Sequence, residues 1–131
     1  MDEKELKEIF GERDQFAKSC GVVIDSAGGG CATGHMDLTP RHLNAVGSAQ
    51  GGALFTLADT VTAAAANSRG RMAVTLQSNA QFLRGASKGR LTAKATEIAA
   101  HRKMPTYAAE ITDEDGHKVF ISTSIFFVKE T

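Results

Sequence analysis

The chain has 131 residues, which fits one domain, and 42% of them are hydrophobic, enough to bury a core without metal or disulfide staples. Its 15 basic and 15 acidic side chains balance, which argues against a nucleic-acid partner that recognises a broad basic surface. Two cysteines without a CxxC pattern and four histidines without zinc-ligand spacing predict free thiols and no metal site.

The N-terminal segment is charged. Within residues 1–17, four apolar side chains recur at helical spacing among acids and bases, and they predict an amphipathic helix over the core that Gly11 interrupts. The segment has no apolar h-region and is therefore not a signal peptide. No run of about 18 apolar residues follows that could span a membrane. We expect a cytoplasmic protein without a membrane partner.

A hairpin and a loop are predicted next. Residues 20–25 and 31–38 have the composition of strands, and Ala27-Gly-Gly-Gly30 is a turn between them. Pro40 then begins a loop that runs to Gln50 and has no period of its own.

A long helix is expected from Gly51 to about Asn67, where Asn67 and Gly70 provide the stop signal. Its side chains are apolar on nearly every face, so the helix should be buried on nearly every side. Asp59 is the only fully charged residue between Arg41 and Arg69. A single acid in such a helix needs an explanation.

Four strands complete the chain, at residues 72–83, 90–100, 106–112 and 117–129. In the first of these, alternation predicts Met72, Val74, Leu76, Ala80 and Phe82 on one face and Thr75, Gln77, Asn79 and Gln81 on the other. Short turns join the last strands, which should therefore pair antiparallel. The predicted fold class is α+β, one domain over residues 1–131 in which a curved antiparallel sheet wraps one central helix.

Two interpretations of Asp59 stay open at this point. A buried lone carboxylate costs several kcal/mol unless it is paired or hydrogen-bonded, so Asp59 could meet a cation or backbone amides from another strand or subunit. Alternatively, it is an acid held in a dry cleft as a general base or nucleophile.

The start of the same helix favours the catalytic interpretation. Gly51 and Gly52 expose backbone N–H groups at the positive end of the helix, where an oxyanion or a polarised carbonyl can be held. Asp59 lies eight residues beyond Gly51, about 12 Å along the axis, so one chain cannot direct both groups at one reacting carbonyl. Two antiparallel helices across a two-fold axis could, which predicts a dimer or a dimer of dimers.

The stretch Asn44-Ala-Val-Gly-Ser-Ala-Gln-Gly-Gly-Ala-Leu-Phe-Thr-Leu-Ala-Asp59 resembles the signature of hotdog-fold acyl-CoA thioesterases of the phenylacetate-degradation (PaaI-like) type. The resemblance extends from about Phe16 to Val128 and includes the element order. It implies a hotdog fold and hydrolysis of an acyl-CoA thioester without a metal or cofactor, coenzyme A being part of the substrate.

The resemblance also implies roles for individual residues. Asp59 would activate water or attack the thioester, and the Gly51 N–H of the facing subunit would polarise the thioester oxygen, with Gly52 beside it. Asn44 would orient water or the carboxylate, and the Thr75 hydroxyl would help to hold the water. The family usually has His where this chain has Gln50, and Gln cannot become cationic.

Acyl-CoA also requires cations for its phosphates. The candidates are Arg84, Lys88 and Arg90 around one turn and Arg102 and Lys103 at the next, of which we favour the Arg102-Lys103 turn. Two other functions stay open: a non-catalytic acyl-CoA-binding or sensing protein, to which Gln50 gives weight, and a dehydratase or hydratase acting on acyl thioesters. A Cys–His nucleophile is conceivable, but no spacing places His35 or His42 beside Cys20 or Cys31.

Overall fold

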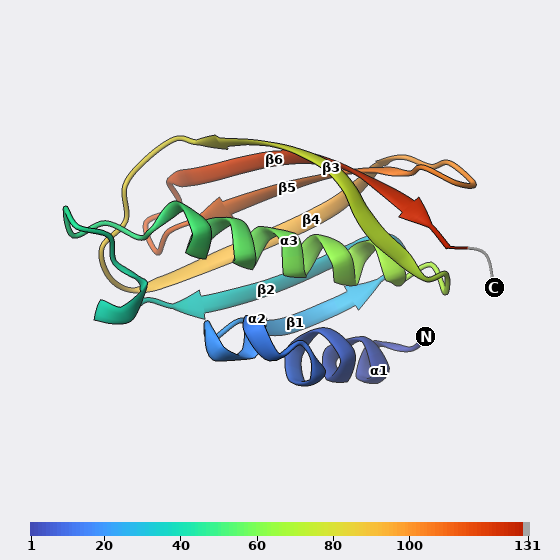
Figure 1. Ribbon diagram of the computed structural model, residues 1–131, viewed down its shortest axis with the longest axis horizontal. Helices are drawn as coiled ribbons and strands as arrows, with labels where there is room; N and C mark the ends of the chain where they lie inside the picture. The colour runs from blue at the N-terminus through green and yellow to red at the C-terminus, as the bar shows by residue number, and fades with distance from the viewer. Residues whose placement is uncertain (130–131) are drawn as a thin grey trace.

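Helix α3 spans Gly51–Asn67, and a six-stranded antiparallel sheet curves around it (Figure 1). The computed structural model describes residues 1–129 of the chain. The strands are β1 (Val23–Gly28), β2 (Cys31–Asp37), β4 (Arg90–Ala99), β5 (Thr106–Thr112), β6 (Lys118–Val128) and β3 (Ala73–Phe82), in this spatial order. The expected α+β hotdog architecture is confirmed.

Strand β3 lies at an edge of the sheet. It comes directly after α3 in the chain, but among residues 1–129 it pairs with β6 alone and forms one edge, while β1 forms the other. An edge strand of ten residues presents unpaired backbone groups along its length. The edge that carries β3 is therefore available for pairing with another chain.

Helix α3 is buried as its composition predicts. Ten of its side chains are buried: Leu54, Leu57, Ala58, Thr60, Val61, Thr62, Ala64, Ala65, Ala66 and Asn67. The helix approaches β2 so closely that a Cβ on Gly34 would lie 2.7 Å from Val61 Cγ2. The hydroxyls of Thr60 and Thr62 donate to helix carbonyls four residues earlier, so burying them leaves no unsatisfied donor. None of the helices in residues 1–129 has the length and apolarity needed to cross a bilayer.

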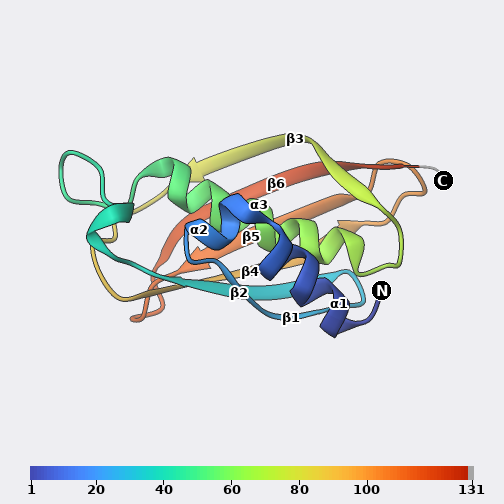
Figure 2. The same cartoon turned by 60° about the horizontal axis from the view of Figure 1, so that its bottom comes forward.

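The N-terminal segment differs from the expected single helix. It consists of α1 (Glu3–Lys7), the π-helical turn η1 (Glu8–Arg13) and α2 (Gln15–Ser19), which together cover α3 opposite the sheet (Figure 2). The break lies at Asp14 rather than Gly11, because the Asp14 carboxylate accepts the Ala17 N–H at 3.1 Å and starts a new helix. Strand β1 accordingly begins later than predicted.

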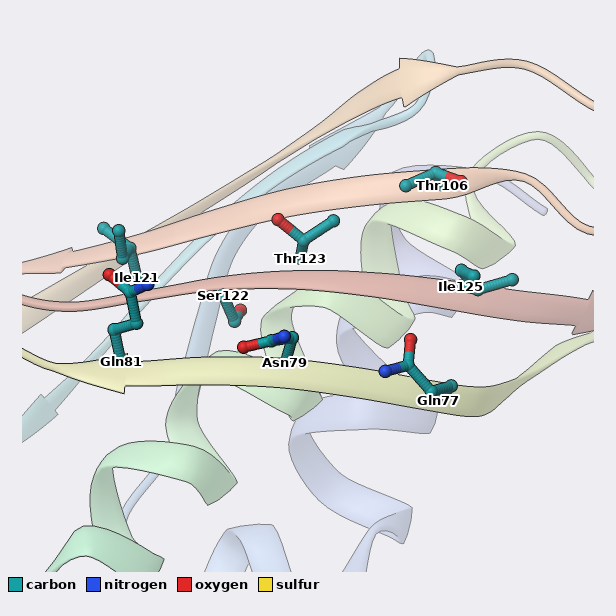
Figure 3. Close-up of a pocket in the computed structure, with 8 residues that line it drawn as sticks. All are labelled: Gln77, Asn79, Gln81, Thr106, Ile121, Ser122, Thr123 and Ile125. Carbon is teal, nitrogen blue, oxygen red and sulfur yellow. The ribbon is translucent and has the colours of Figure 1, made fainter.

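The predicted faces of β3 are partly wrong, because the strand contains a β-bulge. Thr75 pairs with Phe126, but Gln77 pairs with Ile125, so Leu76 is an extra residue. The bulge inverts the alternation, and Thr75 faces α3 instead of sharing a face with Gln77. Beyond the bulge the expected faces hold: Gln77, Asn79 and Gln81 point outward with Thr123 (Figure 3).

The end of α3 is fastened to the start of β3 by one buried amide. Asn67, which is 1% exposed, donates to Ala63 O at 2.9 Å and Ala73 O at 3.0 Å, and accepts from Ala73 N at 3.1 Å. We expect Asn67→Ala to lower the free energy of unfolding by about 2–4 kcal/mol, since it leaves buried backbone groups of Ala73 without partners. Chemical denaturation measures this. Asn79→Ala, an outward and exposed change on β3, should stay within about 0.5 kcal/mol.

Candidate active site

Asp59 and Thr75 meet where α3 faces the edge strand β3. The Thr75 hydroxyl donates to Asp59 Oδ1 at 2.9 Å, across the position that the bulge at Leu76 creates. Burial raises the pKa of the Asp59 carboxyl above its ordinary value, the hydrogen bond from Thr75 lowers it, and the nearby charge of Asp14 raises it. The net direction is upward, which gives a carboxylate that is more basic than an ordinary aspartate.

No cation within residues 1–129 neutralises Asp59. In this part of the chain the carboxylate takes part in no ion pair, and its one hydrogen bond comes from a neutral hydroxyl. The interpretation that Asp59 is balanced by a basic residue of the same chain is therefore not supported. A desolvated carboxylate next to a hydroxyl, at an open sheet edge, has the properties of a general base or nucleophile.

The helix start leaves one backbone donor unused. The Gln50 carbonyl accepts from Ala53 N at 2.9 Å and from Leu54 N at 3.2 Å, and the Gln50 side-chain Oε1 accepts from Gly52 N. Among the residues that the structure describes, none accepts from the Gly51 N–H. This donor lies at the positive end of a 17-residue helix, where a developing negative charge is stabilised.

Gly51 and Gly52 lack a Cβ for different packing reasons. A Cβ on Gly51 would lie 3.2 Å from the Phe82 ring, and a Cβ on Gly52 would lie 2.7 Å from Gln50 Oε1. Gly51 therefore allows Phe82 to cover the helix start, and Gly52 allows the Gln50 side chain to fold back onto the helix.

Asn44 organises the loop before the helix. Its Oδ1 accepts from Val46 N at 3.0 Å and Ser48 N at 3.1 Å, and the loop closes through a bridge between Leu43 and Ala49. The structure thus places Asn44 near the helix start of its own chain and engages its oxygen inside the loop. The residues predicted as catalytic form two groups: Asp59 with Thr75, and Asn44, Gln50 and Gly51 around the helix start.

The predicted phosphate-binding cations lie at opposite ends of the molecule. Arg84 follows β3 on a loop that is fastened to the loop before α3 by the bond from Ala49 N to Ala86 O, at 2.7 Å. Arg102 and Lys103 lie on the β4–β5 turn at the other end (Figure 1). Arg71, which sequence reasoning missed, donates to the carbonyls of His101 and Arg102 at 3.3 Å and 3.0 Å and adds a cation to this turn.

An open depression of about 650 Å³ accompanies this turn. It is lined by Arg69, Arg71, Glu97, Ala100, His101 and Arg102. Glu97 pairs with Arg69 at 2.9 Å and accepts from Tyr107 at 2.9 Å, so the depression keeps a positive balance from Arg71 and Arg102. In the sequence, Arg71 is simply one more basic residue after the helix, and no local pattern indicates that it lies beside the β4–β5 turn.

Other clusters are separate from Asp59. A depression of about 450 Å³ on the outer face of β3, β5 and β6 is lined by the outward amides of Gln77, Asn79 and Gln81, by hydroxyls, and by the apolar side chains of Ile121 and Ile125 (Figure 3). Asp113, Asp115 and His117 have ligand atoms within 4.8 Å of one another on the β5–β6 turn, where Asp113 accepts from the backbone N–H groups of the other two. These hydrogen bonds show that the Asp113 carboxylate stabilises the β5–β6 turn, which accounts for the cluster without a metal ion.

The structure does not support a Cys–His nucleophile. His42 Nδ1 accepts from Thr39 N at 3.0 Å, and Nε2 contacts the Cys20 carbonyl oxygen at 2.6 Å, so both ring nitrogens are engaged with backbone groups. His35 bonds Asp25 at 2.7 Å. Neither imidazole is directed at a thiol by any contact within residues 1–129.

If Asp59 acts as a general base or nucleophile, removing the Thr75 hydroxyl should slow the reaction. We expect Thr75→Val to lower kcat by about 10- to 100-fold, because a hydrogen bond to a charged group contributes about 1.5–3 kcal/mol. It should also move the acidic limb of the pH–rate profile to higher pH, since the bond from Thr75 lowers the pKa of Asp59. Thr75→Ser, which retains the hydroxyl, is the matched control. An unchanged profile in Thr75→Val would contradict this role.

Three comparisons with known proteins agree with one another and indicate a thioesterase. Residues 47–120 match the model of the Thioesterase superfamily. The acyl-coenzyme A thioesterase PaaI of Escherichia coli K12 is 38% identical over 104 residues, 79% of this chain and 74% of the relative. The solved E. coli PaaI structure superposes with a TM-score of 0.92 at 32% identity, covering 97% of this chain and 93% of that one.

A second solved structure was determined with a ligand. It is a hypothetical thioesterase protein from Streptococcus pneumoniae TIGR4 with coenzyme A, which superposes with a TM-score of 0.86 at 28% identity. The superposition covers 95% of this chain and 97% of that one.

Proposed function

The chain belongs to the thioesterase superfamily, as a hotdog-fold member of the PaaI-like type, and we propose that it hydrolyses acyl-CoA to coenzyme A and a carboxylic acid at sites shared by two subunits. The observation that carries the proposal is that one helix bears two groups lacking a partner among residues 1–129: the Asp59 carboxylate has no cation beside it, and the Gly51 N–H has no acceptor. Each is half of a thioester-hydrolysing site.

The second half comes from a second copy. Because Gly51 and Asp59 are separated by eight helical residues, about 12 Å, only a neighbouring helix can supply the missing partner. The free edge of β3 supports pairing about a two-fold axis, which places two α3 helices antiparallel on the same face of a continuous sheet. Gly51 of one subunit then lies beside Asp59 of the partner subunit, and the dimer has two equivalent sites.

In this arrangement the reaction proceeds in two steps. The Gly51 N–H donates to the thioester oxygen, and Asp59 takes a proton from a water that Thr75 helps to position. The hydroxide adds to the carbonyl carbon and forms an oxyanion at the donor. The C–S bond then breaks, the thiolate of coenzyme A takes the proton from Asp59, and the carboxylic acid is released. Direct attack by Asp59 would instead expel the thiolate of coenzyme A and form a mixed anhydride. Water that opens this anhydride at the Asp59 carbon leaves its labelled oxygen in Asp59 in a single turnover, whereas the general-base path places the label in the released acid.

The proposed two-fold axis also brings the predicted phosphate-binding cations of the two subunits close to each other. Since antiparallel helices place the end of one α3 beyond the start of the other, Arg84 of one subunit and the β4–β5 turn of the partner subunit come to the same end of the dimer. Arg84, Arg71, Arg102 and Lys103 are then positioned to bind the phosphates of coenzyme A around the mouth of one site.

The experiment that tests this function is a panel of aliphatic and aromatic acyl-CoAs with a thiol-detecting reagent. The wild-type protein should release coenzyme A from at least one of them, with a native mass of a dimer or a dimer of dimers. Binding of acyl-CoA without turnover would favour the sensing function instead. An active monomer would contradict the shared site. The dehydratase or hydratase function loses support because a relative that is 38% identical is an acyl-CoA thioesterase.

A further inference from the structure

His101 lies on the β4–β5 turn, and its two ring nitrogens have different surroundings. Its Nδ1 accepts the backbone N–H groups of Lys103 at 3.0 Å and Met104 at 2.9 Å. A ring nitrogen that accepts hydrogen bonds carries no proton, so the single proton of the neutral imidazole lies on Nε2. These two contacts therefore assign one tautomer to His101, with Nε2–H as a donor.

Arg71 holds the same turn through its carbonyl groups. The Arg71 Nη1 donates to the carbonyls of His101 at 3.3 Å and Arg102 at 3.0 Å. The Lys103 carbonyl accepts from Val128 N at 2.8 Å, which fastens the turn to β6. These bonds fix the conformation of the turn before a ligand arrives, and a preorganised turn lowers the ordering cost of binding.

The depression beside this turn is lined by two residues with unused donors, His101 and Arg71. Within residues 1–129, no group accepts a hydrogen bond from His101 Nε2 or from Nη2 and Nε of Arg71. Because Nδ1 is directed at the backbone of the turn, Nε2 lies on the opposite edge of the ring. Glu97, the acid that lines the depression, is paired with Arg69 at 2.9 Å and therefore does not take up these donors.

A phosphomonoester fits this set of donors. It carries close to two negative charges and has three terminal oxygens, which accept hydrogen bonds from several directions at once. Arg71 offers the planar edge that binds phosphate with two parallel hydrogen bonds, and His101 offers a third donor without adding a charge. Each phosphorus of an esterified diphosphate has only two terminal oxygens and one negative charge, so it uses this set less completely.

We propose that His101 Nε2 and Arg71 bind the 3′-phosphate of coenzyme A in the depression beside the β4–β5 turn, and that His101 Nδ1 positions the turn for this contact. The proposal rests on the proposed function and adds a substrate-binding residue, His101, to it. Arg71 follows the end of α3 at Asn67, which lies eight residues and about 12 Å along the axis beyond Asp59. A phosphate far from the thioester end of coenzyme A suits this position.

The test compares ligands that differ by one phosphate. We expect the wild-type protein to bind coenzyme A about 10- to 100-fold more tightly than 3′-dephospho-coenzyme A in calorimetric titrations, the range for hydrogen bonds to a charged group. Adenosine 3′,5′-bisphosphate should bind more tightly than adenosine 5′-phosphate for the same reason. Equal affinities for the two forms of coenzyme A would overturn the proposal.

The positioning of the turn and the donation to phosphate are separated by His101→Asn. The Asn carbonyl oxygen accepts N–H groups further along the chain, as in Asx turns, but its amide nitrogen lies one bond nearer the backbone and does not reach the place of Nε2. We expect this variant to retain Tm and the affinity for 3′-dephospho-coenzyme A, and to bind coenzyme A about tenfold more weakly. The KM for acyl-CoA should rise in proportion while kcat stays unchanged. His117→Asn, on the β5–β6 turn, is the matched control.

A spectroscopic measurement separates this role from a merely structural one. In NMR spectra of protein with ¹⁵N-labelled histidine, His101 should show a bare Nδ1 and a protonated Nε2, and adenosine 3′,5′-bisphosphate should shift the Nε2 signal. A proton on Nδ1, or an Nε2 signal that the ligand does not move, would overturn the proposal. An equal shift with inorganic phosphate at the same concentration would overturn the assignment to coenzyme A.

Failure of this inference is distinguishable from failure of the proposed function. A wild-type protein that hydrolyses no acyl-CoA but shows the His101 shift with adenosine 3′,5′-bisphosphate would count against the proposed function alone. An active enzyme that binds both forms of coenzyme A equally would overturn the role of His101 and Arg71 alone.

Discussion

Asp59→Asn should reduce kcat/KM for acyl-CoA hydrolysis by at least about a thousandfold while the fold and the proposed dimer persist. Asn has the same shape and can still accept the hydrogen bond from Thr75, which Asp59 receives at 2.9 Å. It cannot take a proton from water or attack a carbonyl. Thiol release under saturating acyl-CoA measures the effect, and hydrolysis at the wild-type rate would rule out Asp59 as base or nucleophile.

The same substitution should leave stability equal or higher at neutral pH. The pKa of Asp59 in the folded protein is raised above its ordinary value near 3.8, so the folded state binds the proton more tightly than the unfolded state. Stability from this group is therefore present at low pH and is lost as the pH rises through the raised pKa. Asparagine does not ionise and avoids this loss, so thermal unfolding near pH 7 should show a Tm at or above that of the wild type.

The wild-type enzyme should in turn lose activity at acidic pH. A general base or nucleophile works only when ionised, so the rate should fall as the pH drops through the raised pKa of Asp59. The acidic limb of kcat/KM should therefore lie above the pH expected for an ordinary aspartate. An acidic limb below that value would mean that Asp59 is not the group that titrates.

Mixing two inactive variants should restore activity, and this is the sharpest expectation for a shared site. Gly51→Pro removes the backbone N–H, and proline is well tolerated at the first position of a helix. The preceding residue, Gln50, already has φ −63° and ψ 138°, which suits a residue before proline. In a heterodimer of Gly51→Pro and Asp59→Asn, one site carries both defects and the other carries neither.

Random exchange of subunits gives about half heterodimers, each with one intact site of two, so about a quarter of wild-type activity should return. If each chain formed its own site, mixing would restore nothing. Gly51→Ala is the matched control, since it adds a Cβ 3.2 Å from the Phe82 ring but keeps the N–H. Its activity measures the steric cost apart from the loss of the donor.

Local patterns predicted the elements well. The bounds of α3, Gly51–Asn67, and of β5, Thr106–Thr112, agree with the structure, because apolar periodicity and stop signals act within a few residues. The conflict between one charge and an apolar helix identified Asp59 without any tertiary information. The two halves of the proposed site were therefore predictable from residue type and spacing.

The geometry of the site depended on pairing between distant segments. The bulge at Leu76 arises from the register of β3 against β6, and a shift of one residue turns every following side chain to the other face. Alternation in the sequence placed Thr75 outward, whereas the bulge turns it to Asp59. The cap formed by Gln50 and the cation Arg71 beside the β4–β5 turn likewise depend on where segments meet in space.

The sequence by itself thus determined which chemical groups this protein has and on which element each lies. The tertiary structure decided which of them meet: it joined Asp59 to Thr75, left the Gly51 N–H without a partner among residues 1–129 and placed β3 at a free edge. The physical reason is that propensity and periodicity are short-range, whereas strand register, bulges and sheet edges follow from contacts between residues far apart in the chain.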